Sequence, residues 1–194
     1  VRATEGIDLI GLGEGADEDG HEHEHTHEGG HSDERSGTLF DPHAWHSLRS
    51  IKGYVSNIAM ALQRVDPVHG ALYQQNAAAY LAKVSSLELS LSLQMQSIPL
   101  ARRHMVMPHN AFAYLARDHD LHIYSLQGLS TEAEASAAQI AEVVRQIKQF
   151  NIQAVFSENI SDKRLINIVR RETGVELGGA LISGALSAQL APTY

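Results

Sequence analysis

One uninterrupted stretch with high helix propensity, Val68 to Ile98, constrains the fold of this 194-residue chain more than any other feature. It is rich in Ala, Leu and Gln, contains no proline, and has its single glycine, Gly70, near the start. At about 1.5 Å per residue, a helix over residues 68–98 is roughly 45 Å long. Such a rod is long enough to cross a whole two-lobed protein.

A shorter helix is predicted to precede it. Asp41 is suited to be its N-cap and Pro42 to be its first residue, and the helix should end near Val65. Apolar residues recur between these ends at helical spacing: Trp45, Leu48, Ile51, Val55, Ile58 and Leu62. The backbone of the first turn should therefore hold His43 in a fixed position.

After Pro99 the pattern changes to short apolar runs that alternate with amphipathic segments. The runs at 105–107, 121–126, 152–156 and 175–182 are predicted strands, and the segments at 110–118, 131–150 and 161–173 are predicted helices. Ser130 is suited to start the middle helix, and Gly174 to end the last one. The alternation predicts an α/β fold, a parallel sheet flanked by helices whose ligands bind beyond the carboxyl ends of the strands.

Between these elements and the N-terminus lies a segment that places five imidazoles in eleven residues: His21, His23, His25, His27 and His31. Gly and acidic residues fill most of the rest of 11–39, which predicts a mobile loop. Neutral imidazole suits zinc, copper and nickel, whereas Mg and Ca prefer oxygen ligands. We therefore expect the loop to capture metal, with zinc favoured.

The net charge of −8 is concentrated in the same segment, because Glu14 to Arg35 contains nine acidic residues and one basic residue. This balance argues against nucleic acid or an anionic membrane as partner and is compatible with collecting cations. Cysteine is absent, so thiolate metal sites are excluded. The chain has no stretch of membrane-spanning length and no signal-peptide pattern, and with neither a starting Met nor a clear stop it is expected to be truncated at both ends.

Two histidines outside the loop lie where ligands of such a sheet are expected to bind. His109 follows the strand 105–107 at the turn into the next helix, where its imidazole should face the crevice at the end of the sheet. His43 lies in the first turn of its own helix, and His46 follows three residues later on the same helical face. An imidazole-rich shell favours Zn²⁺ over Mn²⁺, for which carboxylates are better ligands.

The motif Asp-Pro-His-Ala-Trp at 41–45 resembles that of the cluster A-I solute-binding proteins, the extracytoplasmic zinc or manganese receptors of ABC importers. Further similarity lies in Pro-His-Asn-Ala-Phe-Ala-Tyr at 108–114, Leu-Ser-Thr-Glu-Ala-Glu at 129–134 and Val-Phe-Ser-Glu-Asn at 155–159. The resemblance implies two α/β lobes joined by one long rigid helix, with the metal between them. It also implies a division into residues 1–67, part of an incomplete N-terminal lobe, the linking helix 68–98, and a C-terminal lobe 99–194.

The resemblance also implies which residues bind the metal. His43 and His109 match two ligands of the family, while the first ligand, a His of the N-terminal lobe, should lie upstream of Val1. The family often has an Asp as fourth ligand, and Gly184 stands at that position. Glu158, Ser183 and His46 are the candidates for further ligands or for supporting residues; we favour a surface or supporting role for His46, and helix capping for Glu158 with Asn159.

The expected function is that of a periplasmic or cell-surface receptor, monomeric and not an enzyme, which binds Zn²⁺ and hands it to an ABC permease. A metallochaperone is a further expected partner, and no substrate other than the metal ion is expected. The alternatives are a zinc buffer or metallochaperone that acts mainly through the loop, and a zinc hydrolase. The hydrolase is disfavoured because the chain contains no His-Glu-x-x-His motif.

Overall fold

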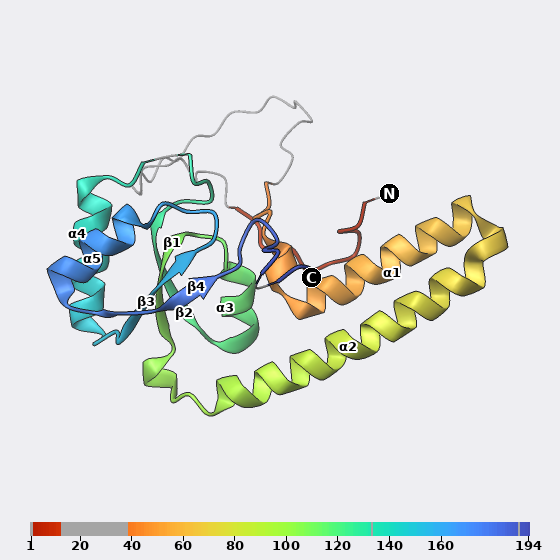
Figure 1. Ribbon diagram of the computed structural model, residues 1–194, viewed down its shortest axis with the longest axis horizontal. Helices are drawn as coiled ribbons and strands as arrows, with labels where there is room; N and C mark the ends of the chain where they lie inside the picture. The colour runs from red at the N-terminus through yellow and green to blue at the C-terminus, as the bar shows by residue number, and fades with distance from the viewer. Residues whose placement is uncertain (1, 13–38, 133, 190) are drawn as a thin grey trace, which may run out of the picture.

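The computed structural model describes residues 2–12, 39–132, 134–189 and 191–194, which form a helical hairpin and an α/β unit (Figure 1). The hairpin consists of α1 (Leu48–Val65) and α2 (Gly70–Gln96). The α/β unit follows in the order β1 (His104–His109), α3 (Ala113–His119), β2 (His122–Gln127), α4 (Ala137–Gln149), β3 (Ala154–Glu158), α5 (Lys163–Thr173) and β4 (Glu176–Leu181). Short 3₁₀ turns precede α1, α2 and β1: η1 (Ala44–His46), η2 (Pro67–His69) and η3 (Leu100–Arg102).

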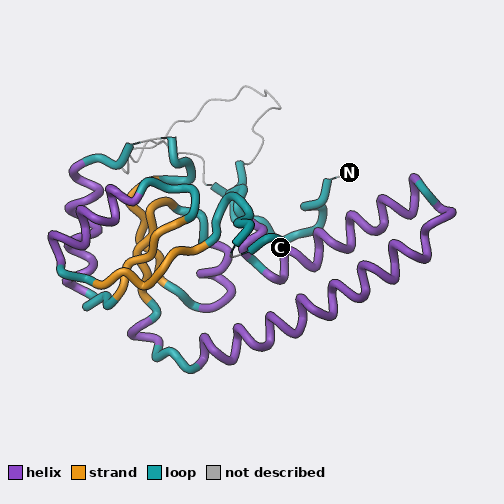
Figure 2. The backbone as a smooth tube through the Cα atoms, in the orientation of Figure 1, coloured by secondary structure: helices purple, strands orange, loops and turns teal. Residues whose placement is uncertain are grey.

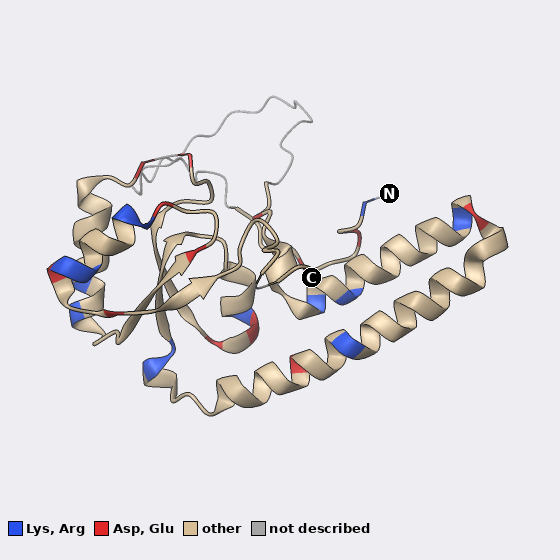
Figure 3. Cartoon of the chain, in the orientation of Figure 1, with Lys and Arg blue, Asp and Glu red and all other residues tan. Residues whose placement is uncertain are grey.

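Helix α2 is the long helix that the sequence predicts, with 27 residues that form a rod of about 40 Å. It runs beside α1 and carries two charged residues, Lys83 and Glu88 (Figure 3). Glu88 accepts a hydrogen bond from Lys52 of α1, so a charged pair links the two helices. No helix in the described part of the chain is long and apolar enough to cross a membrane.

The four strands, orange in Figure 2, form one sheet. Its strands are parallel and lie in the order β2-β1-β3-β4. After β1 the chain passes to β2 on one side, and it later returns to β3 on the other side of β1. The carboxyl ends of β1 and β3 therefore flank the point at which the strand order reverses, where open α/β sheets bind their ligands. His109 is the last residue of β1 and Glu158 the last residue of β3.

Each face of the sheet has its own apolar core, because successive side chains of a strand point to opposite faces. Val106 belongs to the core beneath α4 and α5, together with residues such as Val143 and Ile166. Its neighbour Met107 belongs to the core on the opposite face, together with Phe112. Burial on both faces explains why the strands read as continuous apolar runs in the sequence.

Two helices start at other residues than the sequence predicts. Helix α1 begins at Leu48 with Ser47 as N-cap, and not at Asp41, because the extended backbone of Ser47 separates it from the short turn η1. Helix α4 begins after Ser136, which forms a capping box with Gln139, and not after Ser130. The predicted end at Gly174 is confirmed, since this residue has the left-handed backbone of a helix C-cap, with φ of 72°.

Most of the predicted loop at 11–39, including His21, His23, His25, His27 and His31, lies outside the described residues. Its two ends are described and lie side by side, because Gly11 and Phe40 form an antiparallel bridge. The buried Tyr114 joins the same two segments, since its hydroxyl accepts from the Ile10 N–H at 3.0 Å and donates to the Asp41 carbonyl at 2.7 Å. One phenol thus fixes the backbone that precedes His43.

Replacement of Tyr114 by Phe should lower the free energy of unfolding by about 1–3 kcal/mol, because the Ile10 N–H and the Asp41 carbonyl lose a buried partner. Urea denaturation followed by circular dichroism measures this change. The control is Tyr73→Phe, which removes a hydroxyl that donates to the more exposed Asp66 carboxylate. An equal loss of stability in the two variants would contradict the anchoring role of Tyr114.

Candidate metal centre

The site begins with His43, which is buried and stands immediately before η1. Asp41 holds this residue twice, since one carboxylate oxygen, Oδ1, lies 2.8 Å from both the backbone nitrogen and the ring Nδ1 of His43. Both side chains are almost inaccessible to solvent, with exposed fractions of 9% for His43 and 2% for Asp41. Because Nδ1 faces a carboxylate, Nε2 is the ring nitrogen of His43 that is left to bind a metal.

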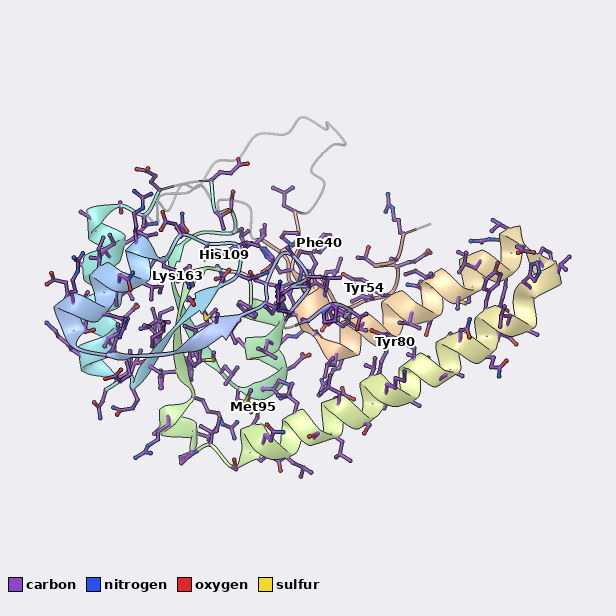
Figure 4. All side chains as sticks on the ribbon, in the orientation of Figure 1. Phe40, Tyr54, Tyr80, Met95, His109 and Lys163 are labelled. Carbon is purple, nitrogen blue, oxygen red and sulfur yellow. The ribbon has the colours of Figure 1, made fainter. Side chains whose placement is uncertain are left out.

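His109 has the same arrangement at the carboxyl end of β1, where Figure 4 labels it. Its Nδ1 lies 2.5 Å from Oε2 of Glu158, a contact with the distance of an ion pair but not the alignment of a hydrogen bond. The backbone N–H of His109 donates to the other oxygen, Oε1, at 3.3 Å. Glu158 therefore holds His109 as Asp41 holds His43, from the end of the neighbouring strand.

Glu158 is fully buried, and its remaining contacts come from the segments that follow β3 and β4. Ser183 Oγ donates to Glu158 Oε2 at 2.8 Å, and Ser161 Oγ at 3.4 Å. The predicted capping role of Glu158 and Asn159 is wrong, because Asp162 caps α5 and Asn159 accepts from the Ser183 N–H. Glu158 and Ser183 are thus hydrogen bonded to each other, and together they support His109.

The two imidazoles meet at the end of the sheet. The ring centroids of His43 and His109 are 5.5 Å apart and their planes are inclined by 72°. Within the described ranges, no three His, Asp or Glu side chains are already grouped so that they could hold one ion. The structure therefore provides two oriented imidazoles, and a complete shell needs further ligands.

His46, the third imidazole near the site, is partly buried, so of the two roles favoured from the sequence the surface role is wrong. Its ring packs against Phe112 with centroids 4.2 Å apart. Burial, and next the nearby His43, lower the pKa of His46 to about 4, so that its ring is neutral at neutral pH.

Two buried carboxylates that each orient an imidazole through Nδ1 are typical of protein sites for borderline transition metals. A family profile described as the zinc-uptake complex component A, periplasmic (ZnuA), matches residues 1–194. The chain belongs to the ZnuA family. Members of this family are metal-binding substrate-binding proteins of ABC transporters, and the family is one of transport receptors, not of enzymes.

Curated relatives of this ZnuA-family chain have names that refer to different metals. The iron-binding protein YfeA of Yersinia pestis is 34% identical over 154 residues, which are 79% of this chain and 50% of YfeA. The zinc-binding lipoprotein AdcA of Streptococcus pneumoniae is 34% identical over 177 residues, which are 91% of this chain and 33% of AdcA. The chain thus spans half or less of the length of these relatives.

Solved structures of ZnuA-like proteins confirm the predicted fold class, a two-lobed α/β solute-binding protein with a parallel sheet and a long helix. A manganese-bound periplasmic metal-binding protein from Candidatus Liberibacter asiaticus is 26% identical with a TM-score of 0.79, covering 100% of this chain and 65% of that one. The periplasmic zinc-binding protein TroA from Treponema pallidum is 29% identical with a TM-score of 0.74, covering 78% of this chain and 57% of TroA.

The sequence prediction missed Asp41 as a site residue, because Asp before Pro at a helix start was interpreted as an N-cap. It also missed Trp45, whose Nε1–H donates to the Ser183 carbonyl at 3.1 Å and thereby links the segment of His43 to the segment of Gly184. A short spacing between an acid and a histidine, as in Asp-Pro-His, is the signal that could have identified Asp41.

Replacement of Asp41 by Asn should weaken zinc binding by about 10–100-fold, because an amide can donate to Nδ1 of His43 and so place the proton on Nε2. Competition with a fluorescent zinc chelator measures this loss. Asp66→Asn is the matched control, since Asp66 lies at the same 2.8 Å from Nδ1 of a histidine, the exposed His69. Equal zinc affinity in the two variants would show that Asp41 does not orient a ligand.

Proposed function

We propose that this chain is the metal-binding part of an extracytoplasmic receptor that binds Zn²⁺ and delivers it to an ABC permease. The observation that carries the proposal is the pair His43 and His109, each oriented by a buried carboxylate at the reversal point of the sheet. The family supports an ABC permease as partner, and the relatives named as lipoproteins or periplasmic proteins support a location outside the cytoplasm. We propose that the receptor acts as a monomer.

The donor atoms favour zinc as cargo. Both oriented side chains are imidazoles, which suit zinc, whereas manganese favours carboxylate and carbonyl oxygens. The carboxylates of Asp41 and Glu158 are engaged with His43 and His109, so they support ligands and are not themselves free to form an oxygen-rich shell. The names of AdcA and TroA, which refer to zinc, support the same choice.

The His-rich segment is proposed to collect zinc for this site. Gly11 and Phe40, which bracket the segment, are bridged to each other, and Phe40 is three residues from His43. Imidazoles of a segment whose ends are fixed beside a site are present there at high effective concentration. Collection by the segment should decrease below about pH 6.5, where free imidazole becomes protonated.

The variant His43→Ala/His109→Ala should lose one tight zinc equivalent and keep the weaker ones, because alanine removes both oriented imidazoles. Isothermal titration with zinc at pH 7.5 and pH 5.5 counts the two classes. The weak class should be smaller at pH 5.5 than at pH 7.5 in the variant and in the unchanged chain, because free imidazoles become protonated. His104→Ala/His122→Ala is the control, since these stacked histidines lie at the opposite end of β1 and β2.

Retention of the tight equivalent by the double variant would contradict the proposed site. It would instead support a zinc buffer or metallochaperone that acts through the His-rich segment. The glycine at position 184, where a carboxylate is expected from the resemblance, is the feature that favours this second function.

Replacement of Gly184 by Asp should raise the affinity for Mn²⁺ by about tenfold relative to Zn²⁺, because the added carboxylate favours manganese. The backbone of Gly184 is not left-handed, and an added Cβ would lie 2.7 Å from Cδ1 of Ile160, the far end of a flexible side chain. Ile160→Ala in the same chain provides the space. Parallel zinc and manganese titrations test the change, with Gly184→Asn as the uncharged control of equal size; equal metal preference for Asp and Asn would refute it.

A further inference from the structure

We infer that His46 is a third imidazole ligand of the transported metal, and that it turns toward His43 when the metal binds. The inference rests on the proposed function and adds a ligand to the same site. His46 supplies a donor atom to the site, whereas Gly184 has none.

The first argument is the backbone that joins the two histidines. The His46 N–H donates to the His43 carbonyl at 3.0 Å and closes a single 3₁₀ turn. In a 3₁₀ helix the side chains at positions i and i+3 lie directly above one another. The turn therefore places the His46 ring on the same side of the backbone as the ring of His43.

The second argument is a buried nitrogen. Nε2 of His46 is inaccessible to solvent and has no hydrogen-bond partner among the residues that the structure describes. A buried polar atom without a partner costs free energy, on the order of 1–3 kcal/mol. A metal ion would satisfy this atom, and an apolar residue would pack against Phe112 without the cost.

The alternative role of His46 is packing alone, since its ring already contacts Phe112 and Trp45. The residues that the structure describes do not include three side chains already placed around one ion, so the ring must turn on binding. A phenylalanine at position 46 keeps a ring for packing and removes both nitrogens. It therefore separates the two roles.

The experiment compares the full chain with His46→Phe, loaded with less than one equivalent of zinc. X-ray absorption at the zinc edge counts the imidazoles on the metal, and chelator competition gives the affinity. His46→Phe should remove one imidazole and weaken zinc binding by about 100-fold, the upper end of the loss for a residue that supports a ligand. The control His104→Phe, which replaces another histidine stacked on a phenylalanine, should change neither value.

An unchanged imidazole count in His46→Phe, with or without a change in affinity, would overturn the inference and leave packing as the role of His46. The His43→Ala/His109→Ala variant is measured alongside. If that variant loses tight zinc binding while His46→Phe keeps the imidazole count, the proposed function stands and the inference fails. If it keeps tight binding, both fail.

Discussion

The carboxylate of Glu158 is the group on which the arrangement of the site depends. A fully buried carboxylate is costly unless donors surround it, and those around Glu158 come from separate parts of the chain. They are the backbone of His109 at the end of β1, Ser161 after β3 and Ser183 after β4. The need to satisfy one charge therefore draws the ends of three strands together at the point where open α/β sheets bind their ligands.

A buried carboxylate also holds His43, but it comes from a residue close by in the sequence. Asp41 is two residues away and fixes both the backbone and the ring of His43 with one oxygen. Tyr114 of α3 donates a hydrogen bond to the Asp41 carbonyl, so the α/β unit also fixes the orientation of His43. The two imidazoles are oriented by different segments that converge on one place, and the geometry of the site thus depends on the packing of α3 and the sheet.

Features with local signals could be predicted from the sequence, whereas contacts between distant segments could not. The strands and the long helix follow from apolar runs and helix propensity, and His109 could be placed because the strand before it was visible. The helix start predicted at Asp41 was wrong because the backbone of Ser47 is extended and separates this segment from α1. Glu158 meets Ser183 across 25 positions, and no local pattern marks that pair. The burial of His46 is likewise a tertiary result, since its helical face alone is equally consistent with a surface position.

Because Gly11 and Phe40 are bridged, the geometry of the site does not depend on the length of the segment between them. Two backbone hydrogen bonds join the segments around Gly11 and Phe40. Residues between these segments can therefore be inserted or removed without moving Asp41 or His43. Doubling the length of such a loop costs only about 0.6 kcal/mol in closure entropy. The number of histidines between Gly11 and Phe40 can therefore change in evolution almost independently of the stability of the fold.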